Sequence, residues 1–436
     1  MLKRKMFRDI RFNKSQFITI FLMVFIGILA YAGIRSYMDG MANLANKFYT
    51  ECNLQDLSAV GENFTEDDLK QIKQIEHVKN AERKLTISGT IDSEEDKTLQ
   101  LNFIESNEIS KFHVIDGIKF NKETKGLWLD EYFANKNNLK VGDTIKIKYD
   151  GETIEEKIIA LINVPDHVYD IKDESAIFPT HVDYGFAYLS INEFPESYVK
   201  KQAMKKANIT EEMVFDLIMP DFNYKNYLIY NYMLIDVDKE ENKNIVKNKV
   251  EEDIEDAIAV TDIKDSLSYA TYQGEIEEGE TYCGVFSGLF LFIAILSVIT
   301  TMTRVVKKQR IQIGTLKALG FKKRKITAHY VGYGFWISLI AAILGLIAGP
   351  ILIGNIFLNL ELAYYQLPGG NATVSTEGFV MATLVVLAIT IVTYLTCRRT
   401  IKRKPCRNFK DRNTKSKTKK LKYYHKRYIQ KNEVFI

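Results

Sequence analysis

Few residues in this chain have the types and spacing that catalysis or ligand binding requires. The six histidines form neither an HExxH pair nor a cluster of metal ligands, and Gly314 and Gly320 are wrongly spaced for a phosphate-binding GxxxxGK[ST] loop. Asp166 beside His167 could be imagined as an acid–base pair, but acidic surface loops produce such neighbours by chance. The sequence therefore predicts no catalytic residue, no cofactor site and no metal site, and the chain is not expected to be an enzyme.

The most informative pattern is a basic loop at residues 304–329, RVVKKQRIQIGTLKALGFKKRKITAH. It carries nine Lys or Arg and no Asp or Glu. Gly320 stands where a left-handed helix end is expected. Four apolar residues are spaced to line one broad side of the short helix before it: Ile311, Ile313, Leu316 and Leu319. We interpret this helix as a rigid lever through which a partner could move the segments on either side.

Four apolar runs without any charged residue predict transmembrane helices. About 18 to 22 helical residues cover a ~30 Å hydrocarbon core. The first run is too long for a signal peptide and lacks a convincing cleavage site, so we interpret it as a retained anchor. The third is longer than needed, which predicts tilt, a kink near Pro350 or projection beyond the bilayer. The charge-free runs are residues 17–34, 282–303, 330–360 and 379–397, and the first predicted span extends by one residue to Arg35 (residues 17–35).

Within the spans, Gly284-xxx-Gly288 and Gly345-xxx-Gly349 each predict a groove for close helix packing. The alternative is that glycine is simply common in membrane helices. Span interiors without ionisable residues argue against a proton- or ion-coupled carrier, which normally needs such groups at mid-membrane.

The basic residues predict the orientation of the spans. Lys and Arg dominate residues 1–16, the loop 304–329 and the tail 398–436, whereas residues 361–378 contain neither. Because basic flanks stay in the cytoplasm, both termini and the basic loop are expected to be cytoplasmic in a bacterial plasma membrane. Residues 1–16 could form an amphipathic helix in the inner interface or a plain basic flank.

The long segment 36–281 is then extracytoplasmic, and it is acidic. It contains 50 Asp or Glu against 27 Lys or Arg, so the net charge of +4 is a cancellation between an acidic exterior and a basic interior. The cations lie where anionic lipid is found, and no nucleic-acid partner is predicted. Cys52 and Cys283 both fall on the outer side, where a disulfide is conceivable. It is not favoured, because a domain of this size can be stable without a disulfide.

The two ends of this exterior segment have similar patterns. Thr65 followed by acids, with Leu69 and Ile72 at helical spacing, predicts a capped helix that leads into a strand. Residues 227–257 repeat the combination of a strand with a helix. We therefore expect two βα halves that come from either end of the segment.

A β-rich insertion is expected between these halves, at about residues 121–190. Alternating apolar residues flank Asp150-Gly151, a typical hairpin turn, and predict a small barrel-like or sandwich module. The predicted fold class is an α-helical membrane protein with four transmembrane helices and a large extracytoplasmic α+β domain between the first two.

The segment IQIGTLKALGFKKRKI (311–326) resembles the coupling loop of the FtsX-like permease family of ABC transporters, the MacB-type or mechanotransmission class. The order of one span, a large exterior domain and three further spans is similar too. Residues 63–82 and 127–169 resemble that family's periplasmic core domain. The resemblance implies that a coupling element docks on a separate ATPase chain, which performs hydrolysis. Carried over by position, this element comprises Arg310, Gly314, Leu316, Lys317, Ala318 and Gly320.

The C-terminal tail departs from the family pattern. Family members tend to follow Lys-Pro with Ala-Glu-x-Leu-Arg, whereas Lys404-Pro405 is followed by CRNFK and a lysine-rich stretch. Many long members also resemble two four-span units in one chain. Our hypothesis is that the tail after Pro405 is a frameshifted or truncated remnant of a longer permease; the alternative is a natural basic tail on anionic lipid.

These observations predict a permease subunit that works with a cytoplasmic ABC ATPase and with a second permease half or a second copy. ATP hydrolysis by the partner would move the exterior domain and export or extract a lipid, lipoprotein or peptide. The alternative function is a transmembrane regulator of a cell-wall hydrolase or a sensor kinase that transports nothing. A third is a membrane-anchored binding protein without energy coupling.

Overall fold

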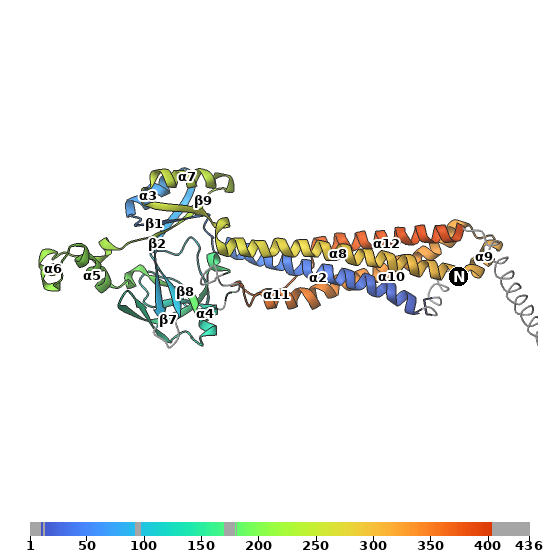
Figure 1. Ribbon diagram of the computed structural model, residues 1–436, viewed down its shortest axis with the longest axis horizontal. Helices are drawn as coiled ribbons and strands as arrows, with labels where there is room; N and C mark the ends of the chain where they lie inside the picture. The colour runs from blue at the N-terminus through green and yellow to red at the C-terminus, as the bar shows by residue number, and fades with distance from the viewer. Residues whose placement is uncertain (1–9, 12–13, 92–96, 170–178, 180, 403–436) are drawn as a thin grey trace, which may run out of the picture. The chain divides into compact units, whose positions relative to one another are not determined.

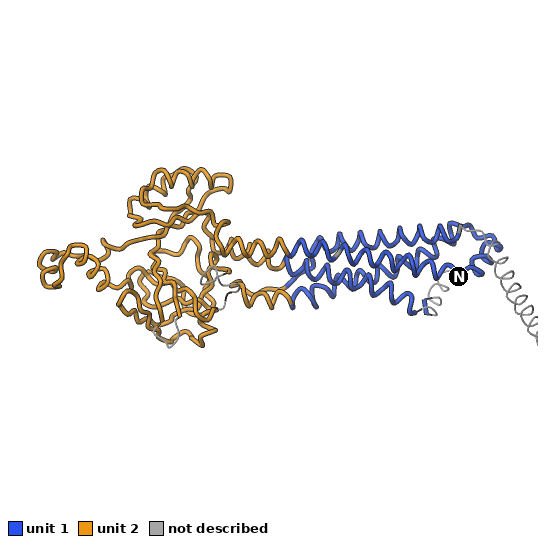
Figure 2. The backbone as a smooth tube through the Cα atoms, viewed as in Figure 1, with its two compact units in different colours: residues 1–39, 279–356, 372–436 blue, residues 40–278, 357–371 orange. Residues whose placement is uncertain are grey.

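The computed structural model describes residues 10–11, 14–91, 97–169, 179 and 181–402. Most of the predicted N-terminal amphipathic helix and the tail from residue 403 therefore lie outside the described residues. The contacts within the chain divide it into two units, shown in Figure 2. We call residues 1–39, 279–356 and 372–436 the helical unit, and residues 40–278 and 357–371 the sheet unit.

Four helices in the described part of the chain are long and apolar enough to cross a membrane. Two of them are far longer than their apolar runs, because polar residues continue the helix: α2 has 38 residues and α8 has 42. Residues 36–49 thus extend the first span. The acidic residues 273–281 are helical as well. The four helices are α2 (Lys14–Glu51), α8 (Leu267–Lys308), α10 (Lys323–Gly349) with its continuation, and α12 (Thr376–Lys402).

The third span changes its helical winding where a kink near Pro350 was expected. A π-helical turn, η6 (Pro350–Gly354), separates α10 from α11 (Asn355–Glu361). Proline has no N–H to donate within a helix and its ring crowds the preceding turn, so a wider local winding accommodates it.

The two glycine pairs have different surroundings. A Cβ on Gly349 would lie 2.8 Å from both Gly33 N and Leu29 O, and one on Gly345 would lie 3.0 Å from Ile28 Cγ2. The backbones of α10 and α2 therefore approach closely along this stripe. For Gly284 and Gly288 on α8, a Cβ would meet no atom of another described segment within 4 Å. Of the two pairs, only Gly345 and Gly349 form a groove that another described helix, α2, fills.

Replacing Gly349 by leucine should destabilise the helical unit by about 3 kcal/mol, because the clash involves backbone atoms that cannot rotate away. Thermal unfolding of the purified protein in detergent measures this effect. The matched control is Gly288→Leu, which has open space in the single chain and should change the unfolding temperature little. Equal effects of the two substitutions would contradict the packing described here.

The sheet unit combines two β structures that share strand β2. In the first, the sheet order is β10-β1-β9-β2, with every neighbouring pair antiparallel. The chain forms two split βαβ units, as the two predicted βα halves required, and α3 and α7 lie on one side of the sheet (Figure 1). The elements are β1 (Leu57–Gly61), α3 (Glu66–Gln74), β2 (Val78–Ile91), β9 (Tyr232–Val237), α7 (Lys243–Asp253) and β10 (Ala257–Asp262).

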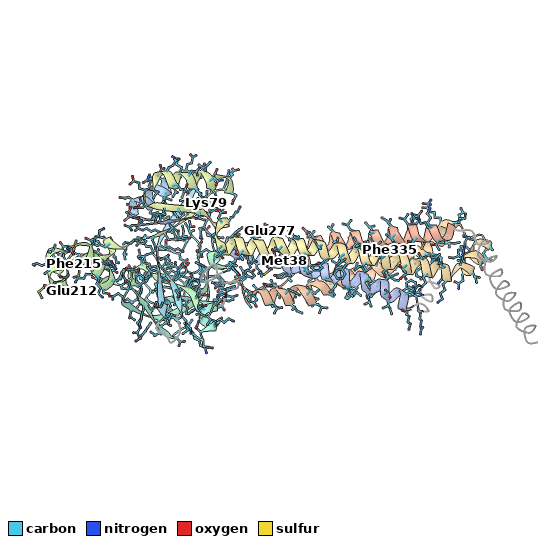
Figure 3. All side chains as sticks on the ribbon, in the orientation of Figure 1. Met38, Lys79, Glu212, Phe215, Glu277 and Phe335 are labelled. Carbon is cyan, nitrogen blue, oxygen red and sulfur yellow. The ribbon has the colours of Figure 1, made fainter. Side chains whose placement is uncertain are left out.

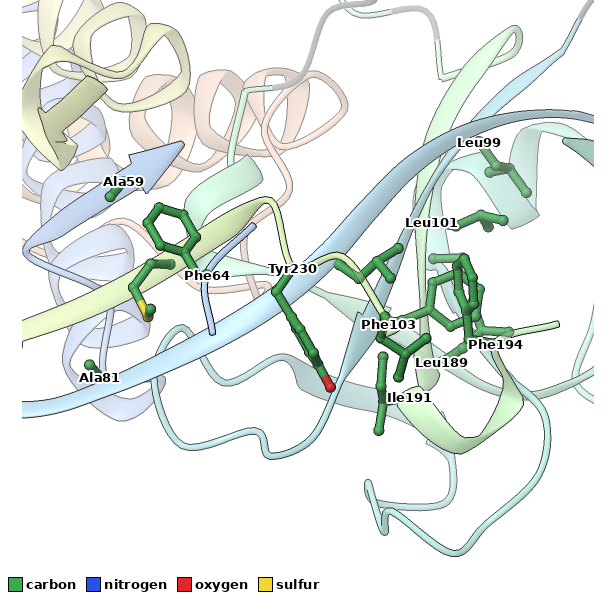
Figure 4. Packing of buried hydrophobic residues seen from close by; sticks show 14 of the residues in the cluster. Ala59, Phe64, Ala81, Leu99, Leu101, Phe103, Leu189, Ile191, Phe194 and Tyr230 are labelled. Atoms are coloured by element: carbon green, nitrogen blue, oxygen red, sulfur yellow. The ribbon is translucent and has the colours of Figure 1, made fainter. Parts of the chain in front are cut away.

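Helix α3 begins with the predicted cap. The Thr65 hydroxyl accepts a hydrogen bond from the Asp68 N–H at 3.2 Å, and the Asp68 carboxylate accepts one from the Thr65 N–H at 2.7 Å. This reciprocal capping box satisfies two N–H groups that no helical carbonyl can reach. Ile72 is then fully buried in the core. Figure 4 shows part of this core, which continues from Ala59 and Phe64 to Phe103 and Phe194.

The second β structure is a closed six-stranded barrel. Strands β2, β3, β8, β5, β7 and β6 pair in that order, and β6 pairs with β2 to close the ring. The ring includes β2 and β3, which precede the predicted insertion at about residues 121–190, so that segment does not form the barrel alone. Asp150 and Gly151, with φ of 44° and 82°, form the expected tight turn between β6 and β7. The barrel elements are β3 (Thr98–Ile104), β5 (Leu127–Asp130), β6 (Thr144–Tyr149), β7 (Glu152–Asn163) and β8 (Tyr184–Ser190), with β4 (His113–Gly117) paired to β7.

Short helices complete the sheet unit. Between β8 and β9, α5 packs against the β6–β7 hairpin, where the Tyr198 hydroxyl lies 3.3 Å from that of Tyr149. Helix α6 follows it, and Figure 3 labels Glu212 and Phe215 there. The Lys200 ammonium holds the two helices together through ion pairs of 2.7 Å with both Glu212 and Asp216. The helices are α4 (Glu131–Lys136), α5 (Glu196–Lys206) and α6 (Glu212–Ile218), with the 3₁₀ turns η1 (Pro165–His167), η2 (Ile191–Glu193), η3 (Tyr224–Tyr227), η4 (Glu240–Asn242) and η5 (Ile263–Asp265).

The half-buried Glu156 on β7 gives the sheet unit a pH-dependent stability. Burial and the neighbouring Glu193 raise the pKa of Glu156 to about 7. The folded protein then keeps a proton that the unfolded chain releases near pH ~4.5, so stability should fall as the pH rises from about 4.5 to 7. Glu156→Gln should remove this fall and stabilise the protein at pH 8 by less than about 2 kcal/mol, since solvent screens a half-exposed group.

Thermal unfolding of the detergent-solubilised chain at pH 5 and pH 8 measures this difference. Glu155→Gln is the control, because Glu155 is exposed and pairs with Lys146 at 3.2 Å across the hairpin. If the Glu156→Gln protein has the same pH profile as the unsubstituted chain, a raised pKa of Glu156 does not cause the fall in stability.

Candidate functional site: the basic loop between α8 and α10

The basic loop folds into a short helix between two chain reversals. Helix α8 ends at Lys308, Gln309 caps α9 (Arg310–Ala318), and α10 begins at Lys323. The end of α9 has the expected left-handed glycine, since φ of Gly320 is 82°. Hydrogen bonds from Gly320 N to Lys317 O at 3.1 Å and from Phe321 N to Leu316 O at 3.0 Å form a Schellman motif. Two of the carbonyls that the helix end leaves unpaired are thereby satisfied.

The apolar residues of α9 do not share one side, so that part of the sequence prediction is wrong. Ile313 is 4% exposed and packs into the core of the helical unit with the half-buried Leu316, whereas Ile311 is 75% and Leu319 70% exposed. At about 100° per residue, Ile313 and Leu316 are about 60° apart, while Ile311 lies about 160° from Ile313 around the axis. Helix α9 therefore has an inner apolar face and a separate outer one.

Two side-chain hydrogen bonds attach α9 to the spans. The Lys317 ammonium donates to the carbonyl oxygen of Ile401 at 3.1 Å, near the C-terminal end of α12. The Tyr330 hydroxyl, on α10, donates to Gln309 Oε1 at 2.7 Å, and both side chains are buried. Burial lowers the pKa of Lys317, and the nearby Lys323 and Arg310 lower it further. Together with its direct connection to α8, these bonds link α9 to three spans.

The outward surface of the loop combines apolar and basic side chains. Ile311, Ala318, Leu319 and Phe321 are exposed, and seven cations are exposed around them. Arg310 and Gly314 are half-buried, and a Cβ on Gly314 would meet nothing within 4 Å. The exposed cations are Arg304, Lys307, Lys308, Lys322, Lys323, Arg324 and Lys325. An apolar patch surrounded by cations suits a partner surface with an apolar groove and acidic edges.

Two residues of this site were missed from the sequence: Gln309 and Tyr330. Gln309 is an uncharged polar residue inside a basic run, which is a weak signal that it faces protein rather than solvent. Tyr330 was assigned to the third span. No sequence pattern indicated that its hydroxyl would bind Gln309, which lies 21 residues earlier in the chain.

No second candidate site emerges in the described part of the chain. There it holds no group of three or more His, Cys, Asp or Glu that could bind a metal ion. Cys52 and Cys283 are both buried free thiols. Asp166 pairs with Lys84 at 3.8 Å, and the ring of His167 stacks on Phe186.

The basic loop and the spans after it match a known family. Residues 284–406 match the model of the FtsX-like permease C-terminal family. This segment is similar to an FtsX-like permease domain. The match includes α9, α10 and α12 and confirms the resemblance that the residues of the loop indicated.

Solved structures of an extracellular domain, a periplasmic region and a permease domain are similar to part of the chain, while no curated protein sequence matches it. The extracellular domain of the noncanonic ABC-type transporter YknZ from Gram-positive bacteria is 14% identical with a TM-score of 0.29, covering 48% of this chain and 98% of that one. The periplasmic region of MacB from Actinobacillus actinomycetemcomitans is 8% identical with a TM-score of 0.28, over 52% and 95%. A domain of a putative permease protein from Porphyromonas gingivalis is 11% identical with a TM-score of 0.24, over 47% and 86%.

The two glycines of the α9 segment should respond oppositely to alanine. At Gly320 a Cβ is strained by the positive φ, so Gly320→Ala should lower the free energy of unfolding by about 1 kcal/mol. Gly314→Ala lies within the helix, has open space, and should raise it by up to ~1 kcal/mol through helix propensity. Thermal unfolding of the two purified variants compares them directly. A shift of the same sign for both would contradict the Schellman end of α9.

Proposed function

We propose that this chain is the transmembrane permease subunit of an ABC transporter, with α9 as the element that receives force from a separate cytoplasmic ATPase. The observation that carries the proposal is the attachment of α9 to three spans through its connection to α8, the Lys317–Ile401 hydrogen bond and the Gln309–Tyr330 hydrogen bond. A helix held at three points cannot rotate without moving the spans. The match of residues 284–406 to a permease family supports the same conclusion.

Charge supports a cytoplasmic position for the loop. Its seven exposed cations fit the positive-inside rule, and they fit contact with anionic lipid at the inner surface. The acidic residues 36–281 then lie outside the cell, and both ends of the chain are cytoplasmic. The exposed Leu319, Ile311 and Phe321 provide the apolar anchors for the ATPase, and the surrounding cations orient it.

The output of the motion is movement of the sheet unit. Helices α2 and α8 run without a break from the helical unit into the sheet unit, so displacement of their inner ends is carried outward along rigid rods. We propose that this movement exports or extracts a lipid, lipoprotein or peptide. The open face of α8 at Gly284 and Gly288 provides a surface for a second permease half or a second copy.

The apolar anchor can be tested by changing Leu319, which is 70% exposed on α9. Leu319→Asp places a carboxylate where an apolar contact is needed and should reduce recovery of the ATPase by at least ~10-fold. The measurement is quantitative co-purification of cytoplasmic ATPases with the tagged permease from detergent-solubilised membranes.

The matched control is Ile258→Asp, because Ile258 is also 70% exposed but lies on β10 of the sheet unit. It should leave ATPase recovery unchanged. If no ATPase accompanies the unsubstituted chain, or if both variants recover it equally, α9 is not the docking element.

A further inference from the structure

The segment between the third and fourth spans is part of the sheet unit. We call residues 357–371 the strap segment; the sequence predicted the third span up to residue 360 and a short exterior loop at residues 361–378. Gln366, in its middle, is fully buried. Its backbone N–H donates to Val168 O at 2.8 Å, and its side-chain Nε2 donates to Asp130 Oδ2 at 3.3 Å and lies 3.4 Å from His181 Nδ1. A loop glutamine with these partners is anchored in the domain.

Tyrosines secure the strap segment on both sides of Gln366. The Tyr132 hydroxyl, on α4, lies 2.9 Å from Leu362 O and 3.0 Å from Tyr365 O, so it donates to the strap backbone. The Tyr365 ring packs between Tyr169 and Tyr272, with ring centroids 5.5 Å and 5.0 Å away. The side chain of Tyr365 is 4% exposed. Burial raises the pKa of the Tyr132 phenol, which therefore stays protonated and able to donate.

The same contacts gather the sheet-unit ends of both long helices. Tyr272 lies in the first turns of α8, and its hydroxyl donates to Met41 O on α2 at 2.7 Å. Near the end of the strap segment, a Cβ on Gly370 would lie 2.5 Å from Leu44 Cδ2, also on α2. The strap segment thus touches α2, α8, α4 and the barrel within one unit.

The chain leaves the strap segment on both sides into the helical unit. It enters from the third span at Ile356–Phe357 and departs toward the fourth span at Asn371–Ala372. Any displacement of the outer ends of these spans must stretch, move or undock the strap segment. Undocking would expose the buried Gln366 and leave the buried Asp130 carboxylate without one of its donors, which is unfavourable.

We propose that residues 357–371 are a mechanical strap that ties the fourth span to the sheet unit, so that this span, and not only the helices that enter the unit without a break, moves the domain. This inference rests on the proposed function for the source of the motion. The docking of the strap is independent of that function. Its contribution to movement depends on the connection between Asn371 and the fourth span being short.

The test lengthens that connection without touching the docked residues. Inserting six Gly and Ser residues between Asn371 and Ala372 adds slack of about 13 Å r.m.s.. Hydrogen exchange on the full chain with its ATPase, with and without ATP and vanadate, reports both docking and movement. In the unmodified chain the Gln366 amide should exchange about 100-fold or more slowly than in unfolded chain. The insertion should retain this protection and the ATPase, but reduce the ATP-dependent change in sheet-unit protection at least about 3-fold.

The matched control is the same insertion at the exposed turn Asp150–Gly151, which should leave the ATP-dependent change intact. A second variant, Gln366→Leu, removes the side-chain donor and should raise exchange across residues 357–371 while ATPase recovery stays the same.

The outcomes separate the strap hypothesis from the proposed function. An ATP-dependent response that survives the slack insertion overturns the strap, as does rapid exchange of the Gln366 amide in the unmodified chain. If no ATPase is recovered with the unmodified chain, the proposed function fails instead, and the exchange of Gln366 alone then supports or rejects docking.

Discussion

The hydrogen bond between the Lys317 ammonium and the Ile401 carbonyl is the constraint on which the proposed lever depends. The last carbonyls of a helix have no partner within it, and a cation is favoured at that end by the helix dipole. Lys317 therefore supplies both a donor and a charge to the end of α12. Without this bond, α9 would be fixed to α8 and α10 only, and its motion would reach the fourth span only through general packing. The spans contain no ionisable residue that could substitute for it in their apolar runs.

A second constraint lies in the sheet unit, where β2 belongs to both β structures. Lys84 is the position on β2 where the two β structures meet. It pairs with Tyr232 of the four-stranded sheet and with Ile104 of the barrel. Its ammonium is buried 4.4 Å above the Tyr232 ring and 3.8 Å from the Asp166 carboxylate, and burial lowers the pKa of Lys84. A one-residue slip of β2 would turn this charge to the other face. These contacts favour one register for the strand that the two β structures share.

The sequence was sufficient for features that depend on local chemistry. Apolar runs gave the spans, Thr65 gave the start of α3, Asp150-Gly151 gave the hairpin, and Gly320 gave the end of α9. Features that depend on distant partners could not be predicted. Nothing around Lys84 indicates that one strand serves two sheets, and no local pattern around Tyr330 or Gln366 names Gln309 or Asp130 as a partner. The two faces of α9 were misassigned because apolar spacing alone cannot tell burial from a docking surface.

The two kinds of connection between the units should carry different forces. A continuous helix such as α2 or α8 resists bending and compression, because displacing one end breaks or strains a ladder of hydrogen bonds. An irregular segment such as residues 366–375 resists extension only, since its backbone can fold up without loss of regular bonds. At one boundary Arg35 joins α2, α8 and α12 through ion pairs with Asp39, Glu280 and Glu377 at 3.0, 2.8 and 3.1 Å. Under the proposed function, the first two spans would push the domain and the last span would pull it.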